Sequence, residues 1–441
     1  MYRPGAASTP SAAPQLSRYT RCPSTSVLEI KLSIDRSGTG PLLPRPAQIP
    51  FSVFFVLVIA YTAIAPNFDQ PFISYAFASA AVFLAIVDSG IRAWAMAIIA
   101  AIGFSLCHRF FAEGVNVAGP SVSLYAGMLG RGCLVVLGWK TVWASPDESR
   151  RFLRYALLAV GIVGFVLASL LALNLTVTGR TRVLDSYLYI FDGSLGFQPS
   201  FVLGQFFARC KPLAAVARAS YFALPLVIAM VSAVYLRSRS AWRPLAILTS
   251  AGVLGYLLYW AFPATGPLYV AGADFPASPH SFATLAQIHP HPITLPIPAP
   301  RNAMPSLHMA WALLLWFSCR PFSRLVRGFA LAYVVLTVVA TLGTGEHYLA
   351  DLLVALPFSV AVQALWTPSQ GISRYAALAG GTSLMLIWLF ALRYGSQIFL
   401  LTPIIPWACL IVSTAISLAL ERFLYFPPPS RPTAADANRL H

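Results

Sequence analysis

Long apolar stretches separated by short polar segments make up most of the chain after residue 48. Several of these stretches reach the ~20 apolar residues that an α-helix needs to cross ~30 Å of hydrocarbon. The pattern predicts an all-α, polytopic membrane protein with about twelve transmembrane helices. The predicted spans begin near Phe51, Ile73, Ala93, Ser121, Tyr155, Ala219, Pro244, Met304, Gly328, Tyr348, Tyr375 and Phe399.

The positions of the basic residues predict the orientation of these spans. Arginines and lysines recur in every second loop, and such loops face the cytoplasm. An even number of spans then places both termini in the cytoplasm. One outer segment, 176–218, is an exception because it is also basic, but long translocated segments escape the rule. The second long outer segment, 263–303, is rich in proline. This composition predicts that the segment is extended and fairly stiff and covers the outer face.

Composition narrows the class of protein. Of 441 residues, 58% are hydrophobic and 10% are charged, against roughly 25% charged residues in a soluble domain. The net charge of +16 comes from loop residues that orient the spans, so we expect no nucleic acid partner. We also expect no metal and no organic cofactor. Three histidines in the proline-rich segment, His280, His289 and His291, lack helical spacing and are expected to be solvent-exposed.

Two histidines stand at the predicted outer ends of spans. His308 follows "MPS", and His347 lies in "GTGEHYLAD", 347 − 308 = 39 residues later. That separation equals about two crossings of ~20 residues, so both histidines return to the same outer surface. Each lies at the N-terminal end of an inward-running helix, where free N–H groups and the helix dipole attract anions. Two such ends together predict a phosphate site.

Neighbouring residues complete the predicted chemistry. Asp351 follows His347 by four residues, which on one helix face would let its carboxylate hold the imidazole N–H and leave the other ring nitrogen as a nucleophile. Gly345 permits close backbone approach to a ligand. Ser306 fits the start of a helix, and its hydroxyl could donate to a phosphoryl oxygen.

The stretches "MPSLHMA" and "GEHYLAD" resemble the second and third signature motifs of the type 2 phosphatidic acid phosphatase superfamily. The reading MPSLH is most similar to the branch that contains the inositol phosphorylceramide synthases. The resemblance implies a six-helix core in which His347 attacks phosphorus, Asp351 orients it and His308 protonates the departing oxygen.

Mapping that core onto the predicted spans divides the chain. The expected parts are a disordered cytoplasmic tail (1–48), a four-helix membrane region (49–145), the six-helix catalytic core (155–370), two additional transmembrane helices (371–420) and a C-terminal cytoplasmic tail (421–441).

The chain departs from the phosphatase motifs at three places. Leu307 replaces the glycine of PSGH, and Ala340 with Thr341 replaces the Ser-Arg pair of the third motif. The first motif, a lysine and an Arg-Pro pair, is not recognisable around "YWAFPATGPLY". Other groups must then stabilise the negative charge of the phosphoryl transition state.

The predicted phosphate-binding residues are Arg301, Ser306, Gly345 and Thr341, and further candidate cations are Arg180, Arg182, Arg209 and Lys211.

Four other ionisable residues are left with open roles. Asp185 and Asp192 are expected to cap turns or pair with arginines. Glu346 either tunes His347 or contacts an acceptor hydroxyl, or is merely solvated. Arg131, within a predicted span, is expected to pair with a carboxylate from another helix.

The favoured interpretation is a lipid phosphotransferase of the bacterial inner membrane with its site facing the periplasm. By resemblance, it would pass an inositol-phosphate-like head group from a phospholipid donor to a ceramide-like or glycolipid acceptor. The alternatives are a lipid phosphate or polyprenyl diphosphate phosphatase with the same histidines, a twelve-span transporter, and a catalytically silent scaffold.

Overall fold

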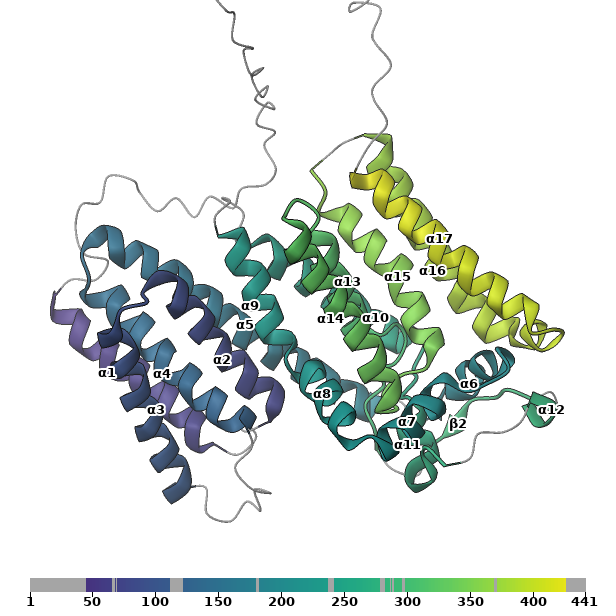
Figure 1. The fold of residues 1–441 in the computed structure, drawn as a ribbon, viewed down its shortest axis with the longest axis horizontal. Coiled ribbons are helices and arrows are strands. Elements are labelled where there is room, and N and C mark those ends of the chain that lie inside the picture. Colours follow the sequence, from purple (N-terminus) through teal and green to yellow (C-terminus); the bar gives the residue numbers. More distant parts are fainter. Residues whose placement is uncertain are drawn as a thin grey trace, which may run out of the picture. The chain divides into compact units, whose positions relative to one another are not determined.

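The protein is described from a computed structural model, in which residues 45–65, 68, 70–111, 122–179, 182–236, 242–277, 282–285, 287, 289–295, 298–368 and 371–425 are placed. Helices form nearly all of the regular structure in this part of the chain, as the apolar pattern predicts (Figure 1). The predicted N-terminal tail falls outside these residues except for its last four positions, which already belong to the first helix.

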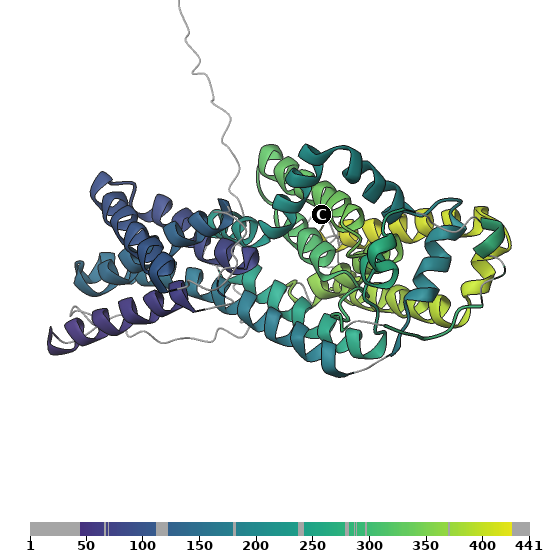
Figure 2. The same ribbon diagram turned by 90° about the horizontal axis from the view of Figure 1, so that it is seen from below.

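Four helices precede the region with the histidine motifs, and α2 and α3 both pack against α4. They appear as the purple and blue ribbons of Figure 2. Gly130 of α4 allows close packing, because a Cβ there would meet the backbone of Phe77 at 2.2 Å. The helices are α1 (Arg45–Ile64), α2 (Pro71–Val87), α3 (Ile91–Phe111) and α4 (Val122–Trp143).

Arg131 is fully buried inside this group. Its guanidinium, which the sequence predicts to pair with a carboxylate, donates to the backbone carbonyls of Thr62 at 2.9 Å and Phe68 at 3.1 Å. The guanidinium carbon also lies 4.2 Å from the ring centroid of Phe77. Carbonyl oxygens and an aromatic face thus surround the charge inside an apolar bundle.

The long helix α5 (Pro146–Gly179) continues to the outer segment, which contains three helices: α6 (Asp185–Ser194), α7 (Pro199–Arg209) and α8 (Lys211–Phe222). The chain then bends by 55° between α8 and α9 (Leu224–Tyr235). Helix α10 (Arg243–Ala261) leads into the proline-rich segment, which holds α11 (Pro267–Ala271), the 3-10 turn η1 (Gly272–Asp274) and α12 (Phe282–Leu285).

A short antiparallel ladder ties the two long outer segments together. Strand β1 (Arg182–Val183) pairs with β2 (Ile293–Thr294), so that Arg182 is opposite Thr294. The proline-rich segment is therefore attached by backbone hydrogen bonds to the start of the 182–222 region.

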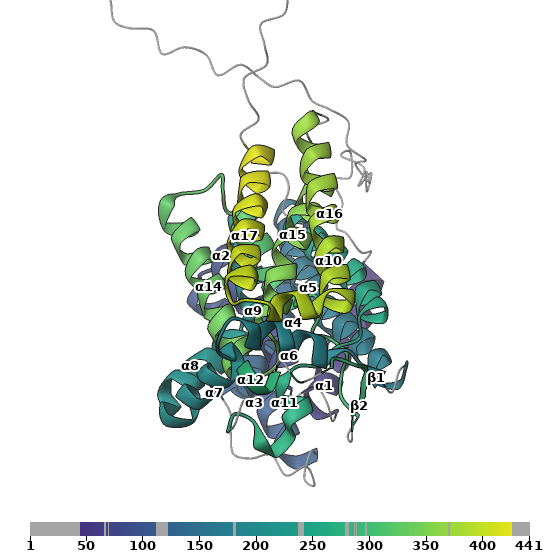
Figure 3. The same ribbon diagram turned by 90° about the vertical axis from the view of Figure 1, so that its right-hand side faces the viewer.

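Helices α13 (Leu307–Ser318), α14 (Arg324–Gly343) and α15 (Leu349–Leu365) follow, and α13 packs against both others. The last two long helices, α16 (Ile372–Tyr394) and α17 (Ile404–Tyr425), lie side by side with the turn η2 (Ser396–Leu400) between them (Figure 3). Arg320, after α13, donates from Nε to Oε1 of Glu421 in α17 at 3.0 Å. This ion pair joins α17 to the preceding helices.

Each predicted span corresponds to an apolar helix, but the helices differ in length. In the described residues, eight helices are long and apolar enough to cross a membrane, and the bent pair α8–α9 would make a ninth. Helices α2, α13 and α15 are apolar but have only 17, 12 and 17 residues. At 1.5 Å per residue, 12 residues extend ~18 Å, well short of ~30 Å of hydrocarbon. The chain is an integral membrane protein with eight or nine candidate spans, and twelve stays a prediction.

Candidate active site

The N-terminal ends of α13 and α15 lie together, as the spacing of the two histidines predicts. Ser306 caps α13, and its hydroxyl accepts from the N–H of Met309 at 3.3 Å. The N–H of Ser306 donates to the carbonyl of Asp351 at 3.3 Å. Further along, the hydroxyl of Ser359 reaches the carbonyl of Ala310 at 3.4 Å. The two helices therefore run in the same direction, and both present their N-termini to one place.

His347 and Asp351 are neighbours, but not on one helix. His347 lies in the segment before α15, which begins at Leu349, whereas Asp351 is in the first turn. Nδ1 of His347 is 3.4 Å from Oδ2 of Asp351. The same carboxylate oxygen accepts from the N–H of Tyr348 at 2.8 Å. The helical four-residue spacing expected from the sequence is thus replaced by a capping geometry that still brings imidazole and carboxylate together.

The backbone of His347 is held from two sides. Its N–H donates to the carbonyl of Thr341 at 3.3 Å, and its carbonyl accepts from the hydroxyl of Ser200 at 2.8 Å. Gly345 has a positive φ of 75°, a conformation that glycine adopts without strain. A Cβ at that position would also lie 2.7 Å from the ring of Phe275. These contacts fix the turn that carries the histidine.

Two buried aspartates from α6 support the site. Asp192 accepts from the N–H groups of Leu349 at 2.7 Å and Ala350 at 3.0 Å, and so caps α15. Asp185 accepts from the N–H of Gly266 at 2.8 Å and from Thr265. The expectation that these aspartates cap turns is confirmed. Burial raises the pKa of Asp185 to about 7 and that of Asp192 to about 8, although their hydrogen bonds act in the opposite direction.

The distal nitrogens of both imidazoles are unused by the protein. Among the residues that the structure describes, no group hydrogen-bonds to Nε2 of His308 or to Nε2 of His347, and both atoms are buried. The two histidines interact electrostatically. The ring of His308 stacks on Tyr221 with centroids 4.0 Å apart. An oriented ring with an unsatisfied buried nitrogen is suited to contact a substrate.

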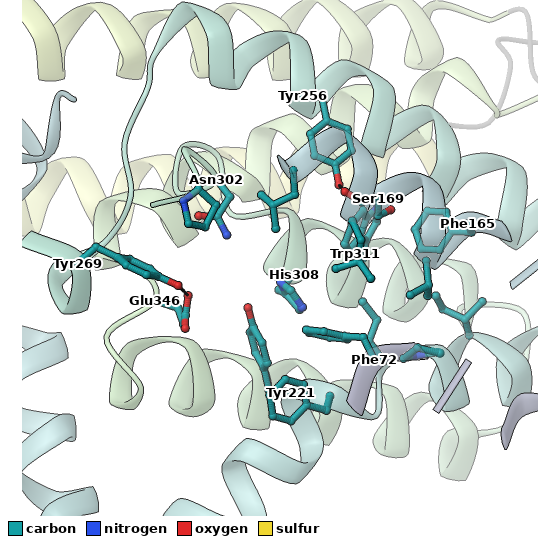
Figure 4. A pocket seen from close by; sticks show the side chains of 18 residues that line it. Phe72, Phe165, Ser169, Tyr221, Tyr256, Tyr269, Asn302, His308, Trp311 and Glu346 are labelled. Carbon is teal, nitrogen blue, oxygen red and sulfur yellow. Dashed lines mark hydrogen bonds between the residues drawn. The ribbon is translucent and has the colours of Figure 1, made fainter. Parts of the chain in front are cut away.

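His308 faces a cavity of about 230 Å³ that we call the apolar cavity (Figure 4). Glu346 and Tyr269 lie on one side of the His308 ring, and Phe72 and Phe165 on the other. The hydroxyl of Tyr269 donates to Oε2 of Glu346 at 3.2 Å. Burial raises the pKa of Glu346, while the charge of His347 and the bond from Tyr269 lower it.

A second cavity of about 560 Å³, here the basic cavity, adjoins the first. The two share Tyr221, Phe222 and Glu346 in their linings. The basic cavity is also lined by Lys211 and Arg218, which are seven residues apart on α8 and therefore lie on one helix face two turns apart. A cavity lined by two cations and by Glu346 thus lies beside the apolar cavity that contains His308.

The other predicted phosphate ligands have different surroundings. The guanidinium of Arg301 donates to the carbonyls of Val177, at 3.2 Å, and Ala299, so that it fastens the proline-rich segment to α5. The hydroxyl of Thr341 donates to the carbonyl of Thr337 in its own helix at 2.8 Å. A role of either residue in binding phosphate stays a prediction.

Of the further candidate cations, Lys211 lines the basic cavity, Arg182 lies in β1 and Arg209 ends α7. Arg180 lies outside the described residues. His289 and His291 are exposed as expected, and His280 also lies outside the described residues.

A comparison with protein families gives this geometry a context. Residues 186–365 match the model of the PAP2 superfamily. This segment is a PAP2 superfamily domain. No curated protein and no solved structure matches the chain.

The PAP2 domain contains both histidines, Asp351 and the two cations of the basic cavity. It also contains Gly266, whose N–H donates to Asp185, and Asp192, which caps α15. Helices α1–α5 and α16–α17 lie outside the matched residues. The match supports the superfamily that the motifs resemble, whereas the inositol phosphorylceramide synthase-like branch stays a prediction.

Sequence reasoning did not name Arg218, which lines the basic cavity together with Lys211. It looked for the cations of the first motif around residues 259–269, whereas the cations that line the basic cavity are Lys211 and Arg218. A signal was present, because a lysine and an arginine seven residues apart at the start of a helical segment fall on one face. The capping role of Asp192 toward α15 had no local signal, since the contact joins residues 157 positions apart.

Proposed function

We propose that the chain is a membrane phosphotransferase that moves a phosphorylated head group from a phospholipid donor to a lipid hydroxyl through a phosphohistidine on His347. The reaction takes place on the extracytoplasmic side of the membrane. The observation that carries the proposal is that both imidazoles have a buried Nε2 atom without a hydrogen-bond partner among the described residues, and that Nδ1 of His347 lies 3.4 Å from the carboxylate of Asp351. The PAP2 match supports an enzyme over a transporter.

In the first half-reaction, Nε2 of His347 attacks the phosphorus of the donor. A nitrogen–phosphorus bond forms and the bond from phosphorus to the lipid oxygen breaks. His308 gives its proton to that departing oxygen. Asp351 faces Nδ1 of His347, so it holds the reactive tautomer and stabilises the positive charge that develops on the ring.

In the second half-reaction, the hydroxyl oxygen of the acceptor attacks the phosphohistidine. The nitrogen–phosphorus bond breaks, and His308 receives the hydroxyl proton, which restores the starting state. The same residue therefore serves as acid and then as base. Because His308 is packed against Tyr221, its ring keeps one orientation through both steps.

The negative charge on the transferring phosphoryl group must be stabilised by positive groups. Lys211 and Arg218 line the basic cavity and have exposed side chains, so they can approach phosphate oxygens. The N-terminal ends of α13 and α15 add the positive ends of two helix dipoles. Together they supply the electrostatic stabilisation that phosphoryl transfer requires.

A hydrolase with the same residues is the second candidate, and the name of the matched superfamily favours it. In that reaction water replaces the acceptor hydroxyl in the second step. The difference lies in what enters the site beside the phosphohistidine, so the two functions can be separated by product analysis.

The test uses purified protein in nanodiscs with a phospholipid donor labelled in its head-group phosphate. Samples quenched in alkaline denaturant, in which a nitrogen–phosphorus bond survives, should carry label on His347, identified by mass spectrometry, and the His347→Ala variant should carry none. Adding a hydroxyl lipid should move the label into a new lipid. Release of soluble head-group phosphate at the same rate with and without acceptor would establish the hydrolase instead. Absence of label on His347 during turnover would overturn both mechanisms.

A further inference from the structure

The imidazole of His308 is surrounded by aromatic rings. Tyr221 of α8 stacks on it with ring centroids 4.0 Å apart and an angle of 19° between the ring planes. Phe72 of α2 and Trp311 of α13 also contact it, with centroids 5.4 Å and 5.9 Å away (Figure 4). Between this imidazole and the other residues that the structure describes, no hydrogen bond is present. The orientation of the ring therefore depends on its aromatic neighbours.

The two histidines of the site differ in this respect. Nδ1 of His347 faces the carboxylate of Asp351 at 3.4 Å, and a carboxylate can hold an imidazole in one tautomer and one orientation. His308 has no such partner in the described part of the chain. A group that exchanges a proton with a substrate must nevertheless keep its nitrogen within ~2.6–3.2 Å of the reacting oxygen. At His308, aromatic packing has to provide this restraint.

One of the packing rings comes from outside the PAP2 domain. Phe72 is the second residue of α2, a helix that packs against α4, α5 and α9. Its ring meets that of Phe222 edge-on, with centroids 4.8 Å apart and an angle of 76°, and lies 5.4 Å from the ring of Tyr221. Edge-to-face and tilted contacts at such distances are favourable for aromatic pairs. Phe72 therefore contacts both the imidazole of His308 and the tyrosine that stacks on it.

Phe72 also connects two hydrophobic clusters. The larger cluster includes Phe83 of α2 and most of the buried core, and the smaller one includes Phe207 of α7 and Tyr221 of α8. Phe72 packs against both. Because a bend of 55° separates α8 from α9, the place of Tyr221 depends on such side contacts. A smaller side chain at position 72 would leave a space between α2 and α8, into which the rings could move.

The same rings suit the charged form of the imidazole. As the proposed acid, His308 carries a proton and a positive charge before the lipid oxygen departs. A positive charge in a buried place is costly unless other groups stabilise it. The face of an aromatic ring within about 6 Å attracts a cation, and the centroids of Tyr221 and Phe72 lie inside this distance. A leucine in place of Phe72 would be apolar but would lack this attraction.

We infer that Phe72 is a positioning residue for His308, through which the helices that precede the PAP2 domain take part in proton transfer. Phe72 acts through the imidazole and through Tyr221. The inference rests on the proposed function for the role of His308 as acid and base, whereas the restraint on its ring does not depend on turnover. Helix α2 is then part of the catalytic unit as well as of the membrane bundle.

The kinetic test compares two donors that differ in their need for a proton. A lipid alkoxide requires a proton to leave phosphorus, whereas 4-nitrophenolate leaves without one at neutral pH. Full-length protein in nanodiscs receives phosphatidylinositol or 4-nitrophenyl inositol phosphate, each labelled in its phosphate. Labelling of His347 is followed by rapid quench in alkaline denaturant. Phe72→Leu should slow labelling from the lipid about tenfold or more, because a misplaced acid is ineffective, and labelling from the nitrophenyl ester less than about twofold.

Two further variants show whether the effect belongs to the aromatic ring at position 72. Phe72→Tyr keeps the ring, and the adjoining cavity has room for the added hydroxyl, so labelling from the lipid should stay within about threefold of the wild type. Phe83→Leu changes a fully buried ring of the same helix that packs against Tyr155. It should lower the melting temperature but leave both labelling rates near those of the wild type. Equal slowing of both donors by Phe72→Leu, or a donor-selective loss in Phe83→Leu, would overturn the inference.

A measurement without turnover separates the inference from the proposed function. In protein with ¹³C-labelled histidine rings, the NMR signal of His308 is assigned by its loss in His308→Gln. The signal should be single and narrow in the wild type and in Phe83→Leu, and broadened or split in Phe72→Leu because the ring then samples more orientations. An unchanged signal in Phe72→Leu would overturn the inference even if His347 carries label. Absence of label on His347 would remove the proposed function, while a broadened signal would still show that Phe72 restrains the ring.

Discussion

Oδ2 of Asp351 lies 3.4 Å from Nδ1 of His347, across the boundary at which α15 begins. The carboxylate is in the first helical turn, and the imidazole precedes the helix. Because Oδ2 also accepts from the N–H of Tyr348, the aspartate caps the helix and faces the histidine at once. One side chain therefore both caps the start of α15 and faces the imidazole of His347.

We predict that Asp351→Asn lowers kcat by at least about 100-fold with little change in KM. An amide keeps the size of the carboxyl group but cannot stabilise a positive imidazole, and it favours the wrong tautomer. Labelling of His347 with donor phosphate should slow in parallel when it is followed by rapid quench. Ser359→Ala, which alters a hydrogen bond farther along α15, serves as the control and should keep most of the activity. Normal labelling kinetics in Asp351→Asn would contradict the assigned role.

Removing either cation of the basic cavity should weaken phosphate recognition. Lys211→Gln and Arg218→Gln are each expected to lower kcat/KM about tenfold or more, because a hydrogen bond to a charged group contributes about 1.5–3 kcal/mol. The measurement is turnover of a phospholipid donor at several salt concentrations. Arg209→Gln removes a nearby exposed charge that ends α7 and should leave kcat/KM within about twofold. Equal losses in all three variants would point to a general charge effect instead.

The buried carboxylate of Asp192 should make stability depend on pH. Its pKa is raised by burial from 3.8 to about 8, so the native state binds a proton more tightly than the unfolded chain does. Stability from this proton is fully present below about pH 4 and is lost as pH rises through about 8. The slope for one such group is at most about 1.4 kcal/mol per pH unit.

Asp192→Asn should therefore flatten the decrease of melting temperature between pH 5 and 8.5 in nanodiscs. The neutral amide also keeps an oxygen that can accept from the start of α15. Asp147→Asn, at an exposed position in the first turn of α5, should reproduce the wild-type curve. A wild-type melting temperature that does not fall over this range would refute the prediction.

The Tyr269–Glu346 hydrogen bond should shift the pH profile of transfer. Removing the hydroxyl with Tyr269→Phe takes away one interaction that lowers the pKa of Glu346, so this pKa should rise further. We expect ionised Glu346 to accept a hydrogen bond from the acceptor hydroxyl. The acidic limb of the plot of activity against pH should therefore move to higher pH. Tyr256→Phe is the matched control, because its hydroxyl donates to the carbonyl of Ser169 in the same cavity. An unmoved acidic limb in Tyr269→Phe would exclude Glu346 from the titration.

The sequence was sufficient to place the two histidines because the distance between them follows from helix length. Apolar runs and a separation of about two crossings require His308 and His347 to return to one surface. Ser306 was also identifiable as a cap, since serine before an apolar run is a local signal. The short length of α13 did have a local signal that was not used, because Arg320 and Pro321 follow almost directly after its last residue, Ser318.

Contacts between distant segments could not be read from the sequence. Asp192 meets α15, and Arg301 meets the end of α5, through tertiary folding that no periodicity encodes. Arg301 is an example. Its position beside the second motif suggested that it binds phosphate, whereas its guanidinium donates hydrogen bonds to two backbone carbonyls. Residue type and proximity in sequence therefore did not indicate which cations line the basic cavity.

The cap that Asp192 provides for Leu349 spans 157 positions, and this has a consequence for biogenesis. At about 5–20 residues per second, a ribosome needs roughly 8–30 s between making one partner and the other. During that interval α6 exists without the helix it caps. A nascent chain stalled before Leu349 would insert its earlier helices yet lack the helix that follows His347, so the candidate site is completed late in translation.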